Sequence, residues 1–289
     1  MAVVIEGRLR AAFRDPVTTA TMDGLTEGLA RVGAGVLLLR DDHQHPDAPS
    51  LATAPIDAVV LIGCNGRMRA ALDQVRARHL PVVVIEGDAG DDIPRIELDN
   101  YEAAALIARH VADLGHDDVA TVTLPFDSDR VRGDASAQRQ ASIEVDVTRD
   151  RLTGVHEVFP ASRVVSTAAS SIDEGVLAGR LLLEGPVRPT AILAQSDLLA
   201  AGIIRAAAEL GVRVPEDVSV TGFDGIAIDG LEGRVLTTAV QPAAEKGRAA
   251  GETIARMLEG EAVASRRFTS QFRAGSTTAA PATRARQAR

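Results

Sequence analysis

The feature that most constrains the fold of this chain is a series of short, apolar segments that alternate with helical stretches. Three of them read Val-Val-Leu-Ile (59–62), Val-Val-Val-Ile (82–85) and Val-Ser-Val-Thr (218–221). Successive side chains of a strand point to opposite faces of the sheet, so a continuous apolar strand is buried on both faces. Such strands are typical of parallel sheets that are covered by helices on both sides.

The order of the expected elements sets the fold class. Strands are expected at 2–5, 36–39, 57–62, 81–85, 95–98, 119–123, 163–167, 190–194 and 218–221, and helices at 17–32, 67–78, 102–114, 173–183, 197–210 and 243–258. This order requires right-handed crossovers and predicts an α/β fold with doubly wound parallel sheets. Two polar stretches are expected to form neither helix nor strand: we interpret 125–142 as a mobile loop and the tail after Gly275 as a disordered end.

Composition excludes several classes of protein. The 289 residues suit one large or two medium domains. Lys plus Arg number 31 against 40 Asp plus Glu, a net charge of −9, which argues against a large nucleic-acid-binding face. The single cysteine, Cys64, excludes an internal disulfide framework and suits a reducing cytoplasm. No apolar segment reaches the roughly 18 residues of a membrane helix, and no secretory signal is evident at the N-terminus.

Motifs for catalysis are missing from the sequence. There is no Gly-x-Gly-x-x-Gly after the first strand, no P-loop, and no nucleophile with a histidine partner. The cluster Asp41-Asp42-His43-Gln44-His45 could ligate a metal, but no third distant ligand accompanies it, so we expect a solvated loop. We therefore expect no enzyme activity, no metal and no cofactor.

Several motifs, in a fixed order, resemble one family. They are Asp15-Pro16, LDNYEAAALIARHVADLGHDDVATVTLP (98–125), RLTGV (151–155), RPTAILAQSDLLAAGIIRAAAELGVRVPEDVSVTGFDG (188–225), LTTAVQP (236–242) and FRAGST (272–277). Together they resemble the effector-binding module of the LacI/GalR family of bacterial transcription regulators, over nearly the whole chain.

The resemblance implies a two-lobed, periplasmic-binding-protein-like type I fold, with three crossing strands and a ligand held in the cleft. The N-terminal lobe is expected at 1–99 and 242–268, and the C-terminal lobe at 100–241 and 269–289. The family places a helix-turn-helix headpiece before this module, whereas Met1 here leads directly into the first expected strand. We expect the headpiece to be absent from this chain, so that DNA is bound only through the parent protein.

The resemblance points to Asp224 and Arg151 as the principal ligand contacts. Asp224 follows an expected strand, and its carboxylate can accept hydrogen bonds from two vicinal hydroxyls. Alternatively, Asp224 before Gly225 simply forms a turn. The guanidinium of Arg151 offers bidentate donors to oxygen atoms, unless it is a solvated arginine paired with Asp150 or Glu157. We expect both side chains to lie at a solvated cleft, where alanine substitution weakens binding without unfolding the protein.

Other candidates follow from the same resemblance. Glu86 ends an expected strand and is either a ligand contact or a loop acid, and Asp99 either contacts ligand or braces the hinge. Ser196 stands at a polar contact position, and Asp197 is expected to cap the following helix. The remaining candidates are Asp15, Val17, Thr18, Ser170 and Gln241.

The family often places aromatic rings at three of these positions, 17, 18 and 170, where this chain has small residues. Their loss weakens any prediction of a sandwiched pyranose or base, because such stacking is worth about 1–3 kcal/mol per base in nucleic-acid sites. Phe13 or Phe126 could substitute for them, or both could be core or loop residues.

The leading hypothesis is a cytoplasmic ligand-sensing domain that binds a small polar metabolite, most readily a sugar, and controls DNA binding allosterically. The partners are then a small-molecule effector, a second copy in a homodimer, and no membrane. Helical segments 199–208 and 249–258 could supply an apolar dimer face or belong to the core. The alternative is an extracytoplasmic solute-binding protein of a transport system, which shares this fold.

Overall fold

The computed structural model describes residues 1–5, 12–40, 51–63, 67–185, 187–228, 231 and 233–282. Cys64 and the Asp41–His45 cluster lie outside these residues. The chain divides into two compact units: unit 1 is 1–99, 144–147 and 242–269, and unit 2 is 100–143, 148–241 and 270–289. The short segment 144–147 thus falls in unit 1, whereas the division expected from the sequence places it in the C-terminal lobe. No helix among the described residues is long and apolar enough to span a membrane.

Unit 1 is built on a six-stranded sheet with the strand order β12-β5-β4-β3-β1-β2, and every pair is parallel. The strands are β1 (Ala2–Ile5), β2 (Leu37–Arg40), β3 (Val59–Ile62), β4 (Val82–Ile85), β5 (Arg95–Leu98) and β12 (Arg266–Phe268). Two of the three apolar segments that opened the sequence argument are therefore neighbouring central strands, β3 and β4, as their continuous hydrophobicity predicts.

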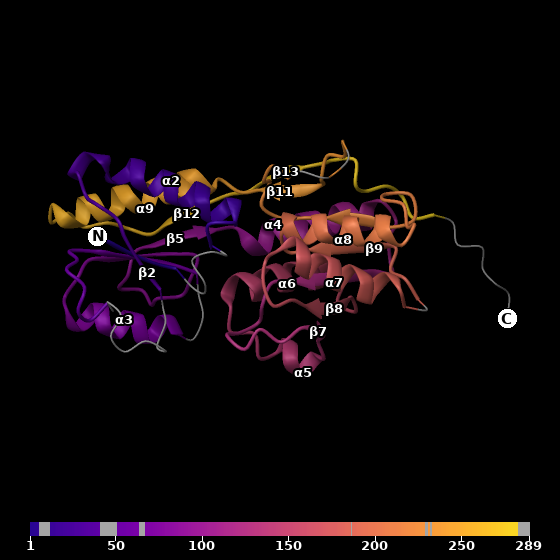
Figure 1. Cartoon of the computed structure of the whole chain (residues 1–289), viewed down its shortest axis with the longest axis horizontal. Coiled ribbons are helices and arrows are strands. Elements are labelled where there is room, and N and C mark those ends of the chain that lie inside the picture. Colours follow the sequence, from indigo (N-terminus) through magenta and orange to yellow (C-terminus); the bar gives the residue numbers. More distant parts are fainter. Residues whose placement is uncertain are drawn as a thin grey trace. The chain divides into compact units, whose positions relative to one another are not determined.

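Helices cover both faces of this sheet (Figure 1). The helix α2 (Pro16–Leu29), followed by the short 3₁₀ turn η1 (Ala30–Val32), lies with α9 (Ala243–Leu258) on one face, and α3 (Arg67–Ala77) lies on the other. Alternate residues of each strand belong to two hydrophobic cores, one on each face of the sheet. Val60 and Val83 pack with Ile254 of α9, whereas Val59 and Val84 belong to the core that contains residues of α3.

The helices α2 and α9 approach each other closely at four glycines, Gly24 and Gly28 on α2 and Gly247 and Gly251 on α9. A Cβ on Gly24 would lie 1.8 Å from the carbonyl oxygen of Ala244, and one on Gly247 would lie 1.9 Å from that of Thr21. Each helix therefore carries a Gly-x-x-x-Gly spacing whose members meet the backbone of the other helix. The two helices therefore pack in direct backbone contact, although they are more than 200 residues apart in the sequence.

Unit 2 is built on a five-stranded sheet with the order β10-β9-β6-β8-β7. Its strands are β6 (Val119–Thr123), β7 (Gly133–Asp134), β8 (Arg163–Ser166), β9 (Ala191–Ala194) and β10 (Ser219–Thr221). All pairs are parallel except the edge pair β7–β8, which is antiparallel. A separate antiparallel pair joins β11 (Thr238–Val240) to β13 (Gln271–Arg273).

Among the residues that the structure describes, five helices belong wholly or mainly to unit 2: α4 (Asn100–Asp113), α5 (Ala137–Gln140), α6 (Asp146–Val158), α7 (Ile172–Leu183) and α8 (Asp197–Glu209). The helices α7 and α8 share a core with strand residues such as Val122 and Ile192. Residues of α4 and α6, among them Ile107 and Val155, lie beside Leu193 of β9. The α/β fold with doubly wound parallel sheets is thus confirmed for both units.

The stretch 125–142 is mostly loop, as its polarity predicts, but it is anchored to the rest of unit 2 and contains two short elements. Phe126 is buried with Ile143, Leu152 and Val164, and the guanidinium of Arg139 lies 5.1 Å from the centre of its ring. The segment adds β7 to the edge of the sheet and forms the short helix α5. The two short elements were not predicted, because the segment is held by one phenylalanine and by contacts distant in sequence rather than by local hydrophobicity.

The tail after Gly275 is also ordered over its first residues. Thr277 is fully buried: its carbonyl oxygen accepts a bond from Val220 N (2.8 Å), and its hydroxyl accepts one from Thr237 N (3.0 Å). The ring of His116 contacts the carbonyl oxygen of Ala279 (2.8 Å). The expectation of a disordered end is therefore wrong for 276–279, because composition does not reveal these distant backbone partners.

The apolar residues of α8 and α9 that could have formed a dimer face belong largely to the core. Ile203 and Ala207 of α8, and Ala250 and Ile254 of α9, are completely buried. Exposed leucines include Leu177 and Leu181 on α7, 52% and 41% exposed, and Leu258 at the end of α9, 40% exposed.

Candidate functional site

Arg151 and Asp224 come together in unit 2. Arg151 lies in α6, and Asp224 follows β10 in the turn 222–225. Nη1 of Arg151 lies 3.6 Å from Oδ1 of Asp224, and the two residues are only 4% and 8% exposed. The expected partnership is present, but its setting is not the solvated one expected from the sequence, because neighbouring side chains and backbone enclose both groups.

Three further contacts hold the guanidinium of Arg151. Its Nε donates to Oδ1 of Asn100 (2.9 Å), its Nη1 donates to the carbonyl oxygen of Gln195 (2.6 Å), and its central carbon lies 3.6 Å from the centre of the Phe223 ring. The ring face attracts the cation and also restricts its orientation. The alternative pairing with Glu157 does not occur, since that carboxylate bonds Tyr101 and Arg109.

One side of this arginine is closely packed. A void of about 10 Å³ is lined by Arg151, Gln195, Thr221, Phe223 and apolar residues of α4, α6 and β9. That volume is at the lower limit for one water molecule, which needs roughly 10–15 Å³. This side of Arg151 therefore does not hold a metabolite.

Gln241 also holds Asp224, through its side chain and its backbone. Nε2 of Gln241 donates to Oδ1 of Asp224 (2.6 Å), and the backbone N–H of Gln241 donates to the carbonyl oxygen of Asp224 (3.1 Å). Asp224 has φ 122° and the next residue, Gly225, has φ 77°. A positive φ is uncommon for a residue with a side chain and marks a constrained turn. Asp224 is thus both a turn residue and a partner of Arg151.

The two serines predicted as contacts lie together. Ser170 donates its hydroxyl hydrogen to Oγ of Ser196 (2.8 Å), and Ser196 in turn accepts from the N–H of Leu199 (3.2 Å). Ser196 is therefore the residue that caps α8. The expectation that Asp197 caps this helix is wrong.

The carboxylate of Asp197 instead points to the segments around Asp224 and β11. It accepts bonds from the N–H of Ile226 (2.9 Å) and the hydroxyl of Thr238 (2.6 Å). Burial raises the pKa of Asp197 to about 6, against the opposing effect of these bonds and of the charge of Arg273. No local pattern in the sequence shows this role, because Thr238 lies 41 residues away.

In unit 1, the candidates Asp15, Val17 and Thr18 form the N-terminal cap of α2. The Asp15 carboxylate accepts from the N–H of Val17 (3.2 Å) and from the hydroxyl of Thr18 (2.7 Å). These bonds satisfy donors that the first turn of a helix leaves unpaired. Phe13, two residues earlier, is 58% exposed and remains available as an aromatic surface, whereas Phe126 is core.

Glu86 has a partner that the sequence reasoning missed. Its carboxylate forms a buried ion pair with the ammonium group of Lys246 in α9. Glu86 itself has φ 59°, at the carboxyl end of β4. One signal could have singled out Lys246, since it is the one lysine of a sequence whose other basic residues are arginines and histidines.

Asp99 is nearly buried at the end of β5, and its backbone N–H donates to the carbonyl oxygen of Phe268 (3.1 Å). This bond joins the residue after β5 to the last residue of β12 within unit 1, and the choice between ligand contact and hinge brace stays a prediction.

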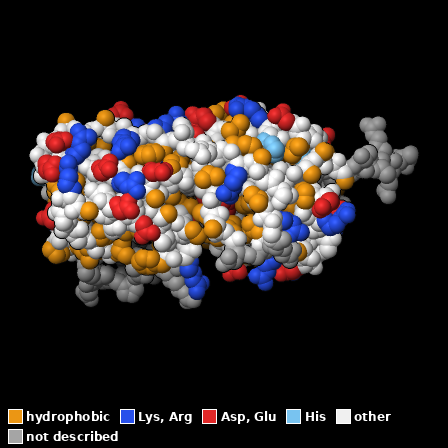
Figure 2. All heavy atoms as spheres, turned by 90° about the horizontal axis from the view of Figure 1, so that it is seen from above, with side chains coloured by type: hydrophobic (Ala, Val, Ile, Leu, Met, Phe, Trp, Pro, Cys, Tyr) orange, Lys and Arg blue, Asp and Glu red, His pale blue; other side chains and the backbone are white. Residues whose placement is uncertain are grey.

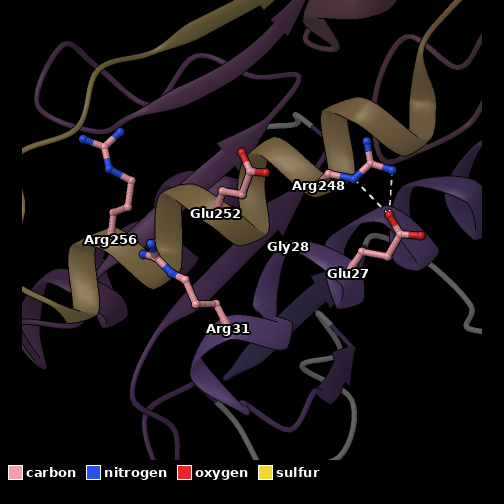
Figure 3. A pocket seen from close by; sticks show the side chains of 6 residues that line it. All are labelled: Glu27, Gly28, Arg31, Arg248, Glu252 and Arg256. Carbon is pink, nitrogen blue, oxygen red and sulfur yellow. Dashed lines mark hydrogen bonds and ion pairs between the residues drawn. The ribbon is translucent and has the colours of Figure 1, made fainter.

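A larger hollow lies away from all of these residues. A groove of about 410 Å³ in unit 1 is lined by residues of α2, η1 and α9, namely Glu27, Gly28, Arg31, Arg248, Glu252 and Arg256 (Figure 3). Arg248 donates twice to Glu27, with distances of 2.6 and 2.9 Å. Arg31 and Arg256 pair with acids of the chain that follows α9.

The charges of this groove are therefore balanced and solvated. Figure 2 shows positive and negative side chains mixed over the α2–α9 part of unit 1 rather than separated by sign. Exposed pairs of this kind contribute little to stability, about 0–1 kcal/mol each. No group of three or more histidine, cysteine, aspartate or glutamate side chains in the described part of the chain could hold a metal ion.

The fold and sequence are similar to those of known regulators. A model of the periplasmic binding protein-like domain matches residues 108–278. An HTH-type transcriptional regulator of Mycolicibacterium smegmatis is 30% identical over 272 residues, covering 88% of this chain and 73% of the relative.

Solved structures agree. A LacI-family regulator from Corynebacterium glutamicum superposes with a TM-score of 0.83 at 27% identity, covering 96% of this chain and 85% of that one. A LacI-family regulator from Enterococcus faecium with bound ribose gives a TM-score of 0.75 at 18% identity, covering 97% and 99%. The chain therefore belongs to the LacI/GalR family of transcriptional regulators, as a periplasmic-binding-protein-like domain.

Proposed function

We propose that this domain binds a small polar metabolite, most readily a sugar, and that binding controls the attachment of its parent protein to DNA. The cluster of Arg151, Asp224 and Gln241 carries the proposal. Its members come from α6, the turn after β10 and the end of β11, so three segments converge where a parallel sheet presents the carboxyl ends of its strands. Open α/β sheets bind their ligands at this edge.

The chemistry of the cluster suits hydroxyl groups. A carboxylate accepts bonds from two neighbouring hydroxyls, and a fixed guanidinium donates in a defined plane. The hydroxyls of Ser170 and Ser196, next along the same edge, add donors and acceptors of similar reach. The ribose held by the Enterococcus faecium regulator is a ligand of this chemical class.

The regulatory part of the proposal rests on the family. The Mycolicibacterium smegmatis relative is named as an HTH-type regulator, which favours transcriptional control over the transport alternative. We propose a cytoplasmic homodimer with no membrane partner and no catalysis of its own. Ligand and DNA are then coupled if each prefers a different arrangement of the protein, typically by about 1–3 kcal/mol. Closure of the two lobes on the ligand stays a prediction.

A binding screen tests the proposal. Purified chain is mixed with D-ribose, cellobiose, other neutral sugars and nucleosides, and ligands that raise the melting temperature are titrated by calorimetry. We expect a sugar to bind, and Asp224→Asn, which keeps the size of the side chain, to weaken it at least about ten-fold. Arg149→Ala, an exposed change on the same helix, serves as the control. A sugar that binds both variants as tightly as the native chain would contradict the assigned site.

A further inference from the structure

We infer that Asp197 is a positioning residue: it holds the turn 223–226, and with it the Asp224 carboxylate, in the geometry of the ligand site. The inference deepens the proposed function and rests on it for the role of Asp224. Asp197 itself is completely buried, so it acts through its neighbours and not by touching a ligand.

The bonds of Asp197 bracket Asp224 in the chain. Its backbone N–H donates to the carbonyl oxygen of Phe223 (2.7 Å), one residue before Asp224. Its Oδ2 accepts from the N–H of Ile226 (2.9 Å), two residues after. The turn that presents Asp224 is therefore attached at both ends to one residue at the start of α8.

The turn needs such attachment, because its conformation is not one that the chain adopts freely. Asp224 has φ 122°, a region that costs free energy for a residue with a side chain and persists only where surrounding structure enforces it. The approach is also close, since a Cβ on Gly222 would lie 2.2 Å from Oδ1 of Asp197. Only glycine at 222 leaves room for the carboxylate.

The same carboxylate reaches the segment that carries Gln241. Its Oδ1 accepts from the hydroxyl of Thr238 in β11 (2.6 Å), three residues before the glutamine whose amide donates to Asp224. Asp197 thus joins the two segments whose side chains meet in the Gln241–Asp224 bond. Its preceding residue, Ser196, caps α8 and bonds Ser170, so the serine pair shares this anchor.

The test measures local opening of the turn without any ligand. Residue-resolved amide hydrogen exchange is recorded on the full chain, native and Asp197→Asn, for the amides of Asp224, Gly225 and Ile226. Asparagine keeps the volume but turns an NH₂ group toward donors that need an acceptor. We expect exchange at these three amides to rise at least about ten-fold, while central amides of β6 and β9 change much less.

Two further variants keep the test decisive. Thr238→Val removes one donor to Asp197 and leaves the carboxylate, so it should raise hydrogen exchange at the same three amides to a smaller extent. This variant also tests the inference if Asp197→Asn folds poorly. Thr121→Val is the matched control, because this buried hydroxyl bonds Ser162 (3.1 Å) and does not contact Asp197.

A uniform rise at turn and core amides, or equal loosening of the turn by Thr121→Val, would reduce Asp197 to a general stabilising residue and overturn the inference. Because no ligand is present, this outcome is independent of the sugar screen. A chain that binds no sugar would remove the proposed function and leave the exchange pattern as it is.

Discussion

Arg151 and Asp224 form a buried pair, with 3.6 Å between Nη1 and Oδ1, inside a unit where neither charge faces open solvent. The guanidinium is also bonded by Asn100 and Gln195 and covered by the Phe223 ring. A ligand that bonds Asp224 would therefore meet a carboxylate whose charge and direction are already set. The same pair links binding to the stability of unit 2.

We predict that Arg151→Met destabilises unit 2. Removing one partner of a buried ion pair leaves the other charge uncompensated, which costs about 3–5 kcal/mol. Urea unfolding followed by circular dichroism measures the loss. The double variant with Asp224→Asn should recover part of it, because the uncompensated carboxylate is then gone. Equal free energies of unfolding for native chain and Arg151→Met would show that the pair contributes nothing.

Lys246 gives a chemical prediction, since the sequence has one lysine. Its ammonium group is paired with Glu86, and the residue is only 2% exposed. An acylating reagent should reach it only when unit 1 opens, so labelling in the native chain should be slower than in urea by at least about ten-fold. Peptide mass spectrometry at residue 246 measures both rates. Glu86→Gln should speed native labelling, and equal rates in native and unfolded chains would contradict the buried pair.

The close contact between α2 and α9 predicts that an alanine in place of Gly247 lowers the stability of the protein. Gly247→Ala places a methyl group 1.9 Å from the carbonyl oxygen of Thr21, so the helices must separate. Overpacking of this kind costs about 1–3 kcal/mol, measured as a lower melting temperature or urea midpoint. Gly35→Ala is the matched control, because no atom lies within 4 Å of the added carbon there. Similar losses in both variants would refute the close approach.

The raised pKa of Asp197 predicts a pH dependence with a defined sign. The pKa is about 6 in the folded chain against 3.8 for the free group. The folded state holds the proton more tightly, so the stabilisation is fully present below pH 3.8 and is lost as the pH rises through 6. The free energy of unfolding of the native chain minus that of Asp197→Asn should therefore fall by about 2 kcal/mol between pH 4 and 7.

Asp217 is the control for that measurement. Its bonds to Arg213 hold the pKa of Asp217 well below its usual range, so its contribution is present above pH 3.8 and lost on acidification. The difference for Asp217→Asn should run in the opposite direction with pH. A flat difference for Asp197→Asn would mean that its carboxyl titrates as an exposed one does.

The sheets were predictable because their signal is local. The strands β3, β4 and β9 each consist of four consecutive apolar residues, and the structure has them at or within two residues of the expected positions. The segment 125–142 lacked such a signal. Its order comes from Phe126 and from pairing with β8, which no local composition shows.

The sequence predicted which residues belong to the candidate site better than it predicted which side chains they contact. Motifs placed Arg151, Asp224 and Gln241 on separate segments, and the structure shows that they touch. The roles of Asp197 and Lys246 depend on partners 41 and 160 residues away, which a single sequence does not reveal. Burial of the Arg151–Asp224 pair was missed for the same reason.

The interleaving of the units has a consequence for synthesis on the ribosome. Unit 1 needs α9 against α2, and unit 2 needs Thr277 and Ala279 bound to Val220 and His116. Neither core can be completed until the segments beyond residue 243 have emerged, although most of each sheet is made long before. Chains truncated before that point and released from the ribosome should expose the apolar face of α2 and depend on chaperones, while released chains that extend beyond residue 280 should not.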